Sequence, residues 1–347
     1  MTSILFFKKM KALSLVVLFC ISGYSQEVFT YEKEISEIGK YDSTEIEIEQ
    51  TEEKIKLYGT LICPKTEFDK VVIIIPGSGK DSRNSHYILV EELLKNDIAV
   101  FRYDERGVGK SEGKYNMVSY CISDKINDVI YAIEHIKSLP FLKDKKIGVI
   151  AHSEGGLASI GAIEKGTNVD FLVQWATPVE KHGAFLKYQV KTGVNLQERN
   201  LQYTDLETKL EVMDLIHKMV EENKNDANDL LREKIKISLK EKGFKKKQFE
   251  WYISFPTYLD LLRKNYEDTY RALKTPTLYI IGSNDKFVDP VSNINILKSF
   301  DNDNIEIKLF NNLNHYLTYG EIKAMNFHLY EIDNLALVEI ITWIKKI

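Results

Sequence analysis

The stretch "KIGVIAHSEGGLASIGAIEK", residues 146 to 165, joins a short apolar run to a run of small residues, with Ser153 at the junction. A nearly continuous apolar run of this length is typical of a strand buried on both faces. The small residues after Ser153 fit a helix packed closely on that strand. The stretch therefore predicts a strand, a sharp turn and a helix, and Ser153 is either the helix N-cap or a group exposed for chemistry.

Five further apolar runs resemble the first one, and a segment of helical period separates most neighbouring runs, as residues 122–139 do. The runs cover residues 70–77, 97–104, 169–178, 275–285 and 304–315. Alternating strands and helices predict a mostly parallel α/β sheet with helices on both faces. Residues 44–50 alternate between polar and apolar, and "KIKLYGTLICP" continues the pattern. We therefore expect an antiparallel hairpin at the start of the mature chain.

One interval, residues 179–273, contains no buried strand and is rich in Lys, Glu, Leu and Tyr. It is too long for a loop in a compact domain, so we expect a helical cap inserted between two strands. The expected organisation is a signal peptide over residues 1–25, the first part of the core over 26–178, the cap over 179–273 and the second part of the core over 274–347.

Residues 1–25 have the order of a secretory signal: lysines, then an apolar stretch, then small residues. We expect cleavage after Ser25 and export to the periplasm or the medium, with Met10 as an alternative start. The apolar stretch is shorter than the roughly 20 residues that a spanning helix needs. We therefore expect no stable membrane insertion after cleavage, and an uncleaved N-terminal anchor is the alternative.

The composition excludes some classes of function. Residues 1–25 contain three lysines and no acidic residue, so their removal changes the formal net charge from −4 to −7. A mildly acidic protein has no electrostatic basis for binding nucleic acid. No His, Cys and Asp cluster has the spacing of metal ligands, and we expect no cofactor. Whether Cys63 and Cys121 pair is left open by the sequence.

Polar residues that suit nucleophilic catalysis follow three of the predicted strands. Ser153, Asp285 and His315 come in that order along the chain, each just after an apolar run. The carboxyl ends of parallel strands meet at one edge of a sheet, which is where such folds collect their functional groups. A serine hydroxyl becomes a nucleophile when an imidazole takes its proton, and a carboxylate orients that imidazole.

From Thr44 to the C-terminus the chain resembles the α/β-hydrolases, in particular exported bacterial esterases and serine-aminopeptidase-like hydrolases. The resemblance is carried by the "PGSG" loop, the "HSEGG" turn, the "GSND" turn and the "LNH" ending, in this order. It implies that Ser153 is the nucleophile, His315 the base and Asp285 the orienting acid. It also implies an oxyanion hole made by the backbone N–H groups of Glu154 and Ser78, with Gly77 as the second choice.

Ala151 departs from the usual G-x-S-x-G pattern of this turn, and Asp289 is a rival for the acid. We expect the turn to tolerate the methyl group of Ala151, because Gly155 and Gly156 keep the helix side bare. We favour Asp285 because it directly follows the predicted strand.

Other residues have structural and functional interpretations side by side. His328 is the other histidine after the acid, and it lies in an apparent helix. The side chain of His152 is expected to point away from the catalytic face. Asp104 and Arg106 form either a substrate clamp or, as we favour, an internal ion pair of their turn. Four aromatic residues of the interval are either the core of the cap or a wall of the pocket: Tyr252, Phe255, Tyr258 and Tyr266.

The sequence thus predicts a serine hydrolase that cleaves a small carboxylic ester, with no cofactor, metal or nucleic acid. A peptidase or amidase acting on short peptides is the alternative, and a binding protein that keeps the fold without turnover is the rival from another class. The oligomeric state and the natural substrate are not readable from the sequence.

Overall fold

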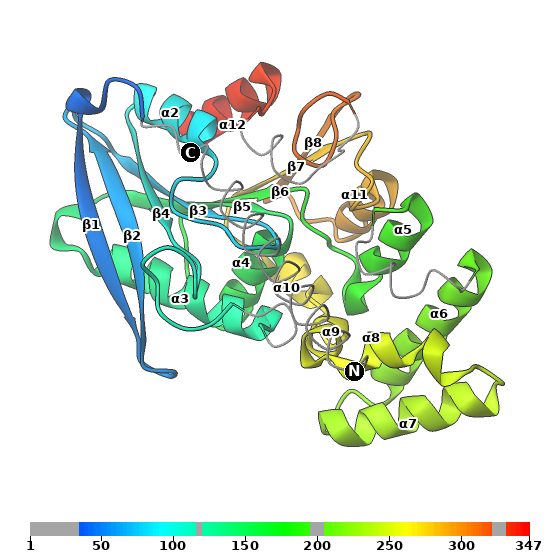
Figure 1. Ribbon diagram of the computed structural model, residues 1–347. Coiled ribbons are helices and arrows are strands. Elements are labelled where there is room, and N and C mark those ends of the chain that lie inside the picture. Colours follow the sequence, from blue (N-terminus) through cyan, green and yellow to red (C-terminus); the bar gives the residue numbers. More distant parts are fainter. Residues whose placement is uncertain (1–34, 116–119, 195–204, 321–330) are drawn as a thin grey trace, which may run out of the picture.

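The computed structural model describes residues 35–115, 120–194, 205–320 and 331–347. Its centre is an eight-stranded sheet of order β1-β2-β4-β3-β5-β6-β7-β8 (Figure 1). The strands are β1 (Tyr41–Gln50), β2 (Ile55–Pro64), β3 (Lys70–Ile75), β4 (Ile98–Tyr103), β5 (Lys146–His152), β6 (Phe171–Trp175), β7 (Thr277–Gly282) and β8 (Ile305–Phe310).

The pairing confirms the predicted fold class. β1 and β2 form the expected antiparallel hairpin, and β2 joins the sheet antiparallel to β4. From β4 to β8 all neighbours are parallel. Every residue of β3, β4, β6 and β7 is buried, as a strand covered on both faces requires.

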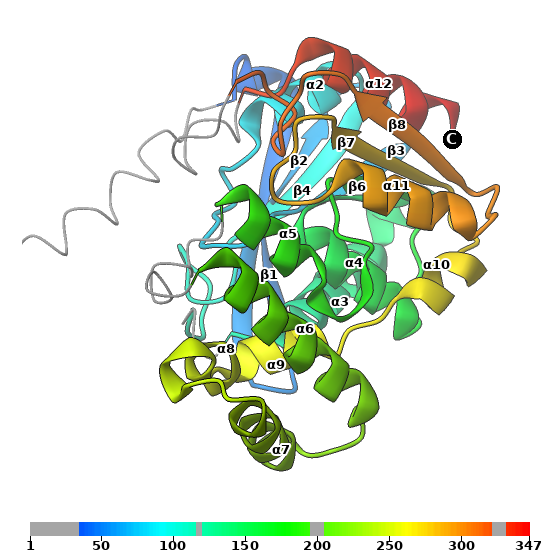
Figure 2. The same cartoon turned by 90° about the vertical axis from the view of Figure 1, so that its right-hand side faces the viewer.

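Helices cover both faces of the sheet (Figures 1 and 2). α2 (Tyr87–Lys95) and α12 (Asn334–Lys346) lie together on one face. On the other face, α3 (Ile122–Ser138), α4 (Glu154–Glu164) and α10 (Glu267–Ala272) pack side by side, and α11 (Pro290–Ser299) packs near β8. The buried residues of α3 recur every three or four positions, which is the pattern of a helix with one face in the core.

The expected helical cap lies between β6 and β7, to the lower right of the sheet in Figure 1. Its helices are α5 (Phe185–Thr192), α6 (Leu206–Glu222), α7 (Asn228–Glu241), α8 (Glu250–Ser254) and α9 (Pro256–Leu262). α9 packs on α3 of the core, and Ser123 of α3 donates to Asp260 at 2.8 Å. α10 ends the interval but packs on α4. Its Tyr270 hydroxyl lies 3.3 Å from Oε1 of Gln174 in β6.

The aromatic residues of the cap are mostly internal. Tyr252, Tyr258 and Tyr266 are buried, and the Tyr252 and Tyr258 rings lie 5.5 Å apart. Tyr252 and Tyr258 belong to the interior of the cap. Tyr266 packs against the core instead, since a Cβ on Gly161 of α4 would lie 2.8 Å from its hydroxyl. Phe255 is half-buried and packs edge-on to Trp251.

The predicted signal peptide lies outside the described residues. Among those that are described, no helix combines the length and the apolar character needed to cross a membrane. Cys63 lies in β2 and Cys121 at the start of α3, and no disulfide joins them in the described part of the chain.

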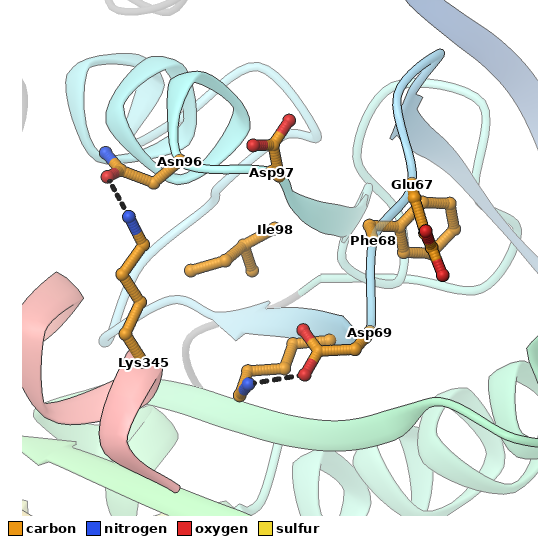
Figure 3. Close-up of a pocket in the computed structure, with 8 residues that line it drawn as sticks. Glu67, Phe68, Asp69, Asn96, Asp97, Ile98 and Lys345 are labelled. Atoms are coloured by element: carbon orange, nitrogen blue, oxygen red, sulfur yellow. Dashed lines mark hydrogen bonds and ion pairs between the residues drawn. The ribbon is translucent and has the colours of Figure 1, made fainter.

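A surface pocket lies at the amino ends of β3 and β4 (Figure 3). Lys345 of α12 closes one side by donating to Asn96 at 2.7 Å, and Lys70 pairs with Asp69 at 2.7 Å. Ser153 follows the carboxyl end of β5, at the opposite edge of the sheet. This pocket is therefore separate from the predicted catalytic residues.

Candidate active site

The carboxyl edge of the sheet gathers the three predicted catalytic residues. Ser153 directly follows β5, Asp285 follows β7 by three residues, and His315 follows β8 by five. Because β5, β6, β7 and β8 are parallel neighbours, their ends open on the same side.

Ser153 occupies a strained turn between β5 and α4. Its backbone has φ 53° and ψ −117°, which is rare for a residue other than glycine. The Ser153 side chain makes no N-cap hydrogen bond to α4. The N-cap interpretation therefore does not describe what its hydroxyl does, and the strained backbone is typical of a functional position.

Two glycines make this turn possible. A Cβ on Gly155 would lie 2.3 Å from the Pro76 carbonyl oxygen, and one on Gly156 would lie 1.7 Å from Thr177 Oγ1. The start of α4 thus passes against the ends of β3 and β6 with no room for a side chain. Ala151 is a buried residue inside β5, where a methyl group fits.

The His315 ring contacts Asp285. Nδ1 lies 2.7 Å from Asp285 Oδ2, and both residues are buried. The second carboxylate oxygen of Asp285 accepts from the backbone N–H groups of Phe287 at 2.7 Å and Val288 at 2.9 Å. The rival, Asp289, caps α11 by accepting from two backbone N–H groups.

The loop that carries His315 is built around Asn314, which the sequence analysis did not single out. Its side-chain oxygen accepts from the N–H groups of Tyr316 at 2.9 Å and Thr318 at 3.2 Å. Its amide nitrogen donates to Thr318 Oγ1 at 2.8 Å. The buried Asn314 thus fixes the turn that carries His315, and an Asn after a strand is a sequence signal for such a role.

His152 lies against His315, so the prediction that its side chain points away from the catalytic residues is wrong. The two ring centroids are 4.9 Å apart, and His152 Nε2 lies 3.3 Å from the His315 carbonyl oxygen. Trp175 packs on its other side at 4.6 Å. The buried His152 ring packs among the His315, Trp175 and Tyr316 rings, and this aromatic packing sets its direction. Burial, and then the neighbouring His315, lowers the pKa of His152 well below its ordinary value.

The predicted oxyanion-hole residues lie on either side of Ser153. Glu154 is the first residue of α4, so its N–H has no acceptor within the helix. A Cβ on Gly77 would lie 3.4 Å from Ser153 Cβ, so the Gly77–Ser78 backbone passes beside Ser153. Both candidate N–H groups thus belong to backbone next to Ser153.

The structure does not join all three groups. Among the described residues, Ser153 Oγ makes no hydrogen bond to His315, although Asp285 and His315 are in contact. Catalytic contacts are often longer in the absence of substrate and shorten when it binds.

Asp104 and Arg106 each have a different structural partner. Arg106 binds Asp128 of α3 through two contacts of 2.7 and 2.6 Å. Asp104 is held by Arg83, whose Nε and Nη2 lie 3.0 and 2.8 Å from Asp104 Oδ2. The favoured interpretation, a structural ion pair, is right in kind, but the partners come from other elements. His328 lies outside the described residues.

No group of three or more potential metal ligands occurs within the described ranges. Residues 66–322 match the family model described as serine aminopeptidase, S33. The chain belongs to this family. No curated protein matches it in sequence.

Solved structures resemble the hydrolase over most of its length. The Pyrococcus furiosus esterase Pf2001 matches with a TM-score of 0.56 and 19% identity, covering 90% of this chain and 93% of its own. Est1E from Butyrivibrio proteoclasticus, solved with ferulic acid, matches with a TM-score of 0.54 and 19% identity, covering 87% and 98%. A meta-cleavage product hydrolase from Pseudomonas fluorescens matches with a TM-score of 0.52 and 16% identity, covering 87% of this chain and 97% of its own. At these identities the likeness establishes the fold, which is that of an α/β-hydrolase.

Proposed function

We propose that this hydrolase cleaves carboxylic esters by two-step acyl transfer at Ser153. The observation that carries the proposal is the buried contact of 2.7 Å between His315 Nδ1 and Asp285 Oδ2, beside a serine in a strained turn. A carboxylate on Nδ1 fixes the tautomer in which Nε2 can accept a proton.

In the first step, Ser153 Oγ attacks the ester carbonyl carbon while His315 Nε2 takes the hydroxyl proton. The carbonyl oxygen becomes an oxyanion, which the N–H groups of Glu154 and Ser78 stabilise. Collapse of this intermediate breaks the bond to the alcohol, which receives the proton from His315. Water then attacks the acyl-enzyme by the same route and releases the acid. The mechanism uses no cofactor.

Two findings bear on the bond that is cleaved. Structures of similar fold are described as esterases, which supports an ester. The family name, serine aminopeptidase, supports a peptide as the second candidate. The chemistry at Ser153 is the same in both cases, so the leaving group decides between them.

The test is hydrolysis of p-nitrophenyl acetate and of an aminoacyl p-nitroanilide by the purified protein, beside Ser153→Ala and His315→Ala. We expect turnover of the ester and a loss of about 10⁴-fold or more in each variant. Faster turnover of the anilide would favour the peptidase. Turnover that survives Ser153→Ala would contradict the nucleophile, and no turnover of either substrate would favour a binding protein.

We also propose that residues 1–25 direct export and are removed. The lysines, apolar stretch and small residues of this segment support the proposal. Mass spectrometry of the protein secreted by its host tests it. A mature N-terminus at Gln26 is expected, and an intact N-terminus on membrane-bound protein would favour the anchor.

A further inference from the structure

Lys125 occupies an unusual place on α3. Most buried residues of this helix are apolar, among them Ile122 and Ile126, yet the Lys125 side chain is fully buried with them. The helix buries a second charged residue, Asp128, which pairs with Arg106. A buried ammonium group needs charged and hydrogen-bonding partners to offset the loss of water. Those partners identify what the residue does.

The Lys125 ammonium group contacts the two segments next to Ser153, the loop after β3 and the start of α4. Nζ donates to the Gly77 carbonyl oxygen at 2.5 Å and lies 3.7 Å from Glu154 Oε1. Its main counter-ion is Glu105, whose Oε1 is 2.6 Å away and which is itself buried. The lysine therefore contacts both segments that carry the proposed oxyanion-hole donors, the Gly77–Ser78 loop and the start of α4.

Glu105 holds the same loop at a second point. Its Oε2 accepts from the Asp81 N–H, and its own N–H donates to the Asp81 carbonyl oxygen, both at 3.2 Å. The loop is thus tied at Gly77 by Lys125 and at Asp81 by Glu105. Ser78 lies between the two ties.

The planarity of the peptide bond links Lys125 to Ser78. In a trans peptide the carbonyl and the N–H point in opposite directions, so a group that fixes the Gly77 carbonyl also fixes the Ser78 N–H. A cation on the carbonyl oxygen also withdraws electron density and makes that N–H a stronger donor.

We propose that Lys125 is a positioning residue for the oxyanion hole, which orients and polarises the Ser78 N–H through the Gly77 carbonyl group. The inference rests on the acyl transfer proposed for Ser153. Lys125 itself does not touch the substrate.

The charge of Lys125 agrees with this role. Burial lowers the pKa of Lys125, but the Glu105 and Glu154 carboxylates outweigh it and leave the pKa above its ordinary value. The group is therefore an ammonium ion across the neutral range, with three protons to donate.

The test compares Lys125→Met, which keeps the length of the side chain and removes the donor, with Glu105→Gln, which breaks the ion pair but leaves Lys125 on Gly77. The double variant Lys125→Met/Glu105→Gln avoids an unpaired carboxylate. Each is assayed for kcat and KM with p-nitrophenyl acetate, and for inhibition by an alkyl trifluoromethyl ketone. Ser153 Oγ adds to the carbonyl carbon of this inhibitor, and the hydroxyl proton passes to His315. The ketone oxygen then becomes an oxyanion in the proposed oxyanion hole.

We expect kcat to fall roughly tenfold or more in both variants that lack Lys125, since removing a whole oxyanion-hole donor costs about 10²- to 10³-fold. KM should stay within about twofold and the ketone Ki should rise in parallel with the loss of kcat. Glu105→Gln should lower kcat less than Lys125→Met does, because Lys125 stays on the Gly77 carbonyl group and the glutamine amide oxygen can still accept from the Asp81 N–H.

If the double variant Lys125→Met/Glu105→Gln is folded and its kcat and Ki are near the wild-type values, the positioning role is overturned and the proposed function is left intact. Equal losses in Glu105→Gln and Lys125→Met would also overturn it, because the effect would then come from the ion pair and not from the hydrogen bond to the Gly77 carbonyl group. Ester turnover that survives Ser153→Ala would overturn the proposed function, and this inference with it.

Discussion

The catalytic edge of the core and the helical cap differ in what holds them together. At this edge the start of α4 packs directly on the backbone that follows β3, since a Cβ on Gly155 would lie 2.3 Å from the Pro76 carbonyl oxygen. The cap packs through large side chains such as Phe249 and Leu231, both fully buried. A backbone contact accepts one residue type, whereas side-chain packing accepts many combinations. The geometry of the turn at Ser153 is therefore fixed at few positions, whereas the cap tolerates more combinations of residues.

The cap nevertheless touches the loop that carries the acid. The Tyr188 hydroxyl of α5 donates to the Asp285 carbonyl oxygen at 2.8 Å, and Thr192 donates to the Lys286 carbonyl oxygen at 2.6 Å. Through these contacts, the position of α5 can affect the orientation of Asp285. Four substitutions test how the two regions and their surroundings respond to change.

The largest effect is expected for Asp285→Asn, because the amide no longer stabilises the imidazolium of His315. We expect kcat to fall by about 10⁴-fold. The control is Asp289→Asn, four residues away, because asparagine is also a good N-cap and α11 should keep its start. Similar losses of ester hydrolysis in the two variants would break the assignment of the acid.

The next effect concerns the cap. Phe249→Ala should lower the free energy of unfolding by about 3 to 5 kcal/mol, because it leaves a cavity between the cap helices. Leu230→Ala, at an exposed position of α7, should change it by less than about 0.5 kcal/mol. Urea titrations followed by circular dichroism measure both. An unchanged midpoint in Phe249→Ala would show that the cap does not depend on its aromatic interior.

A smaller effect is expected at the turn itself. The methyl group of Gly156→Ala would meet Thr177 Oγ1 at 1.7 Å, so we expect a loss of roughly 1 to 3 kcal/mol of stability together with lower turnover. Gly39→Ala is the matched control, because its methyl group meets nothing within 4 Å. If both variants unfold at the wild-type temperature, the backbone contact is not a constraint.

The smallest effect is a dependence of stability on pH. Burial, and then the charge of Arg102, lowers the pKa of His86 to about 3. Below its ordinary pKa the unfolded chain gains a proton that the folded chain does not, so stability falls as the pH falls through about 6.5. His86→Asn should reduce this slope by up to about 1.4 kcal/mol per pH unit. Equal slopes for the two proteins between pH 6.5 and 4.5 would show that folded His86 is protonated.

Much of the core was predictable because local signals are strong there. Strands buried on both faces require continuous apolar runs, and the predicted helix over 122–139 is α3 (Ile122–Ser138). The turn at Ser153 was recognisable because few residue types fit it. Asp285 is favoured over Asp289 because it directly follows a predicted strand, and in the structure it is Asp285 that contacts His315.

The contacts that connect distant segments were not predictable. Lys125 and Gly77 are 48 residues apart in the chain, and Arg106 and Asp128 are 22 apart. A lysine within an apolar helical stripe was the available signal for Lys125, but its partner depends on how α3 packs on the sheet. The predicted orientation of His152 is wrong for the same reason. Its ring packs against Trp175 and His315, which are distant from it in the sequence.

The central claim is that the Asp285–His315 pair activates Ser153. Labelling with an alkyl fluorophosphonate tests it most directly, because the serine oxygen displaces fluoride and stays bound to phosphorus, whatever the natural substrate is. Peptide mapping by mass spectrometry should find one label, on Ser153, and labelling should be lost in Ser153→Ala and slowed by orders of magnitude in His315→Ala. Label on another serine, or none on the folded wild-type protein, would contradict the claim.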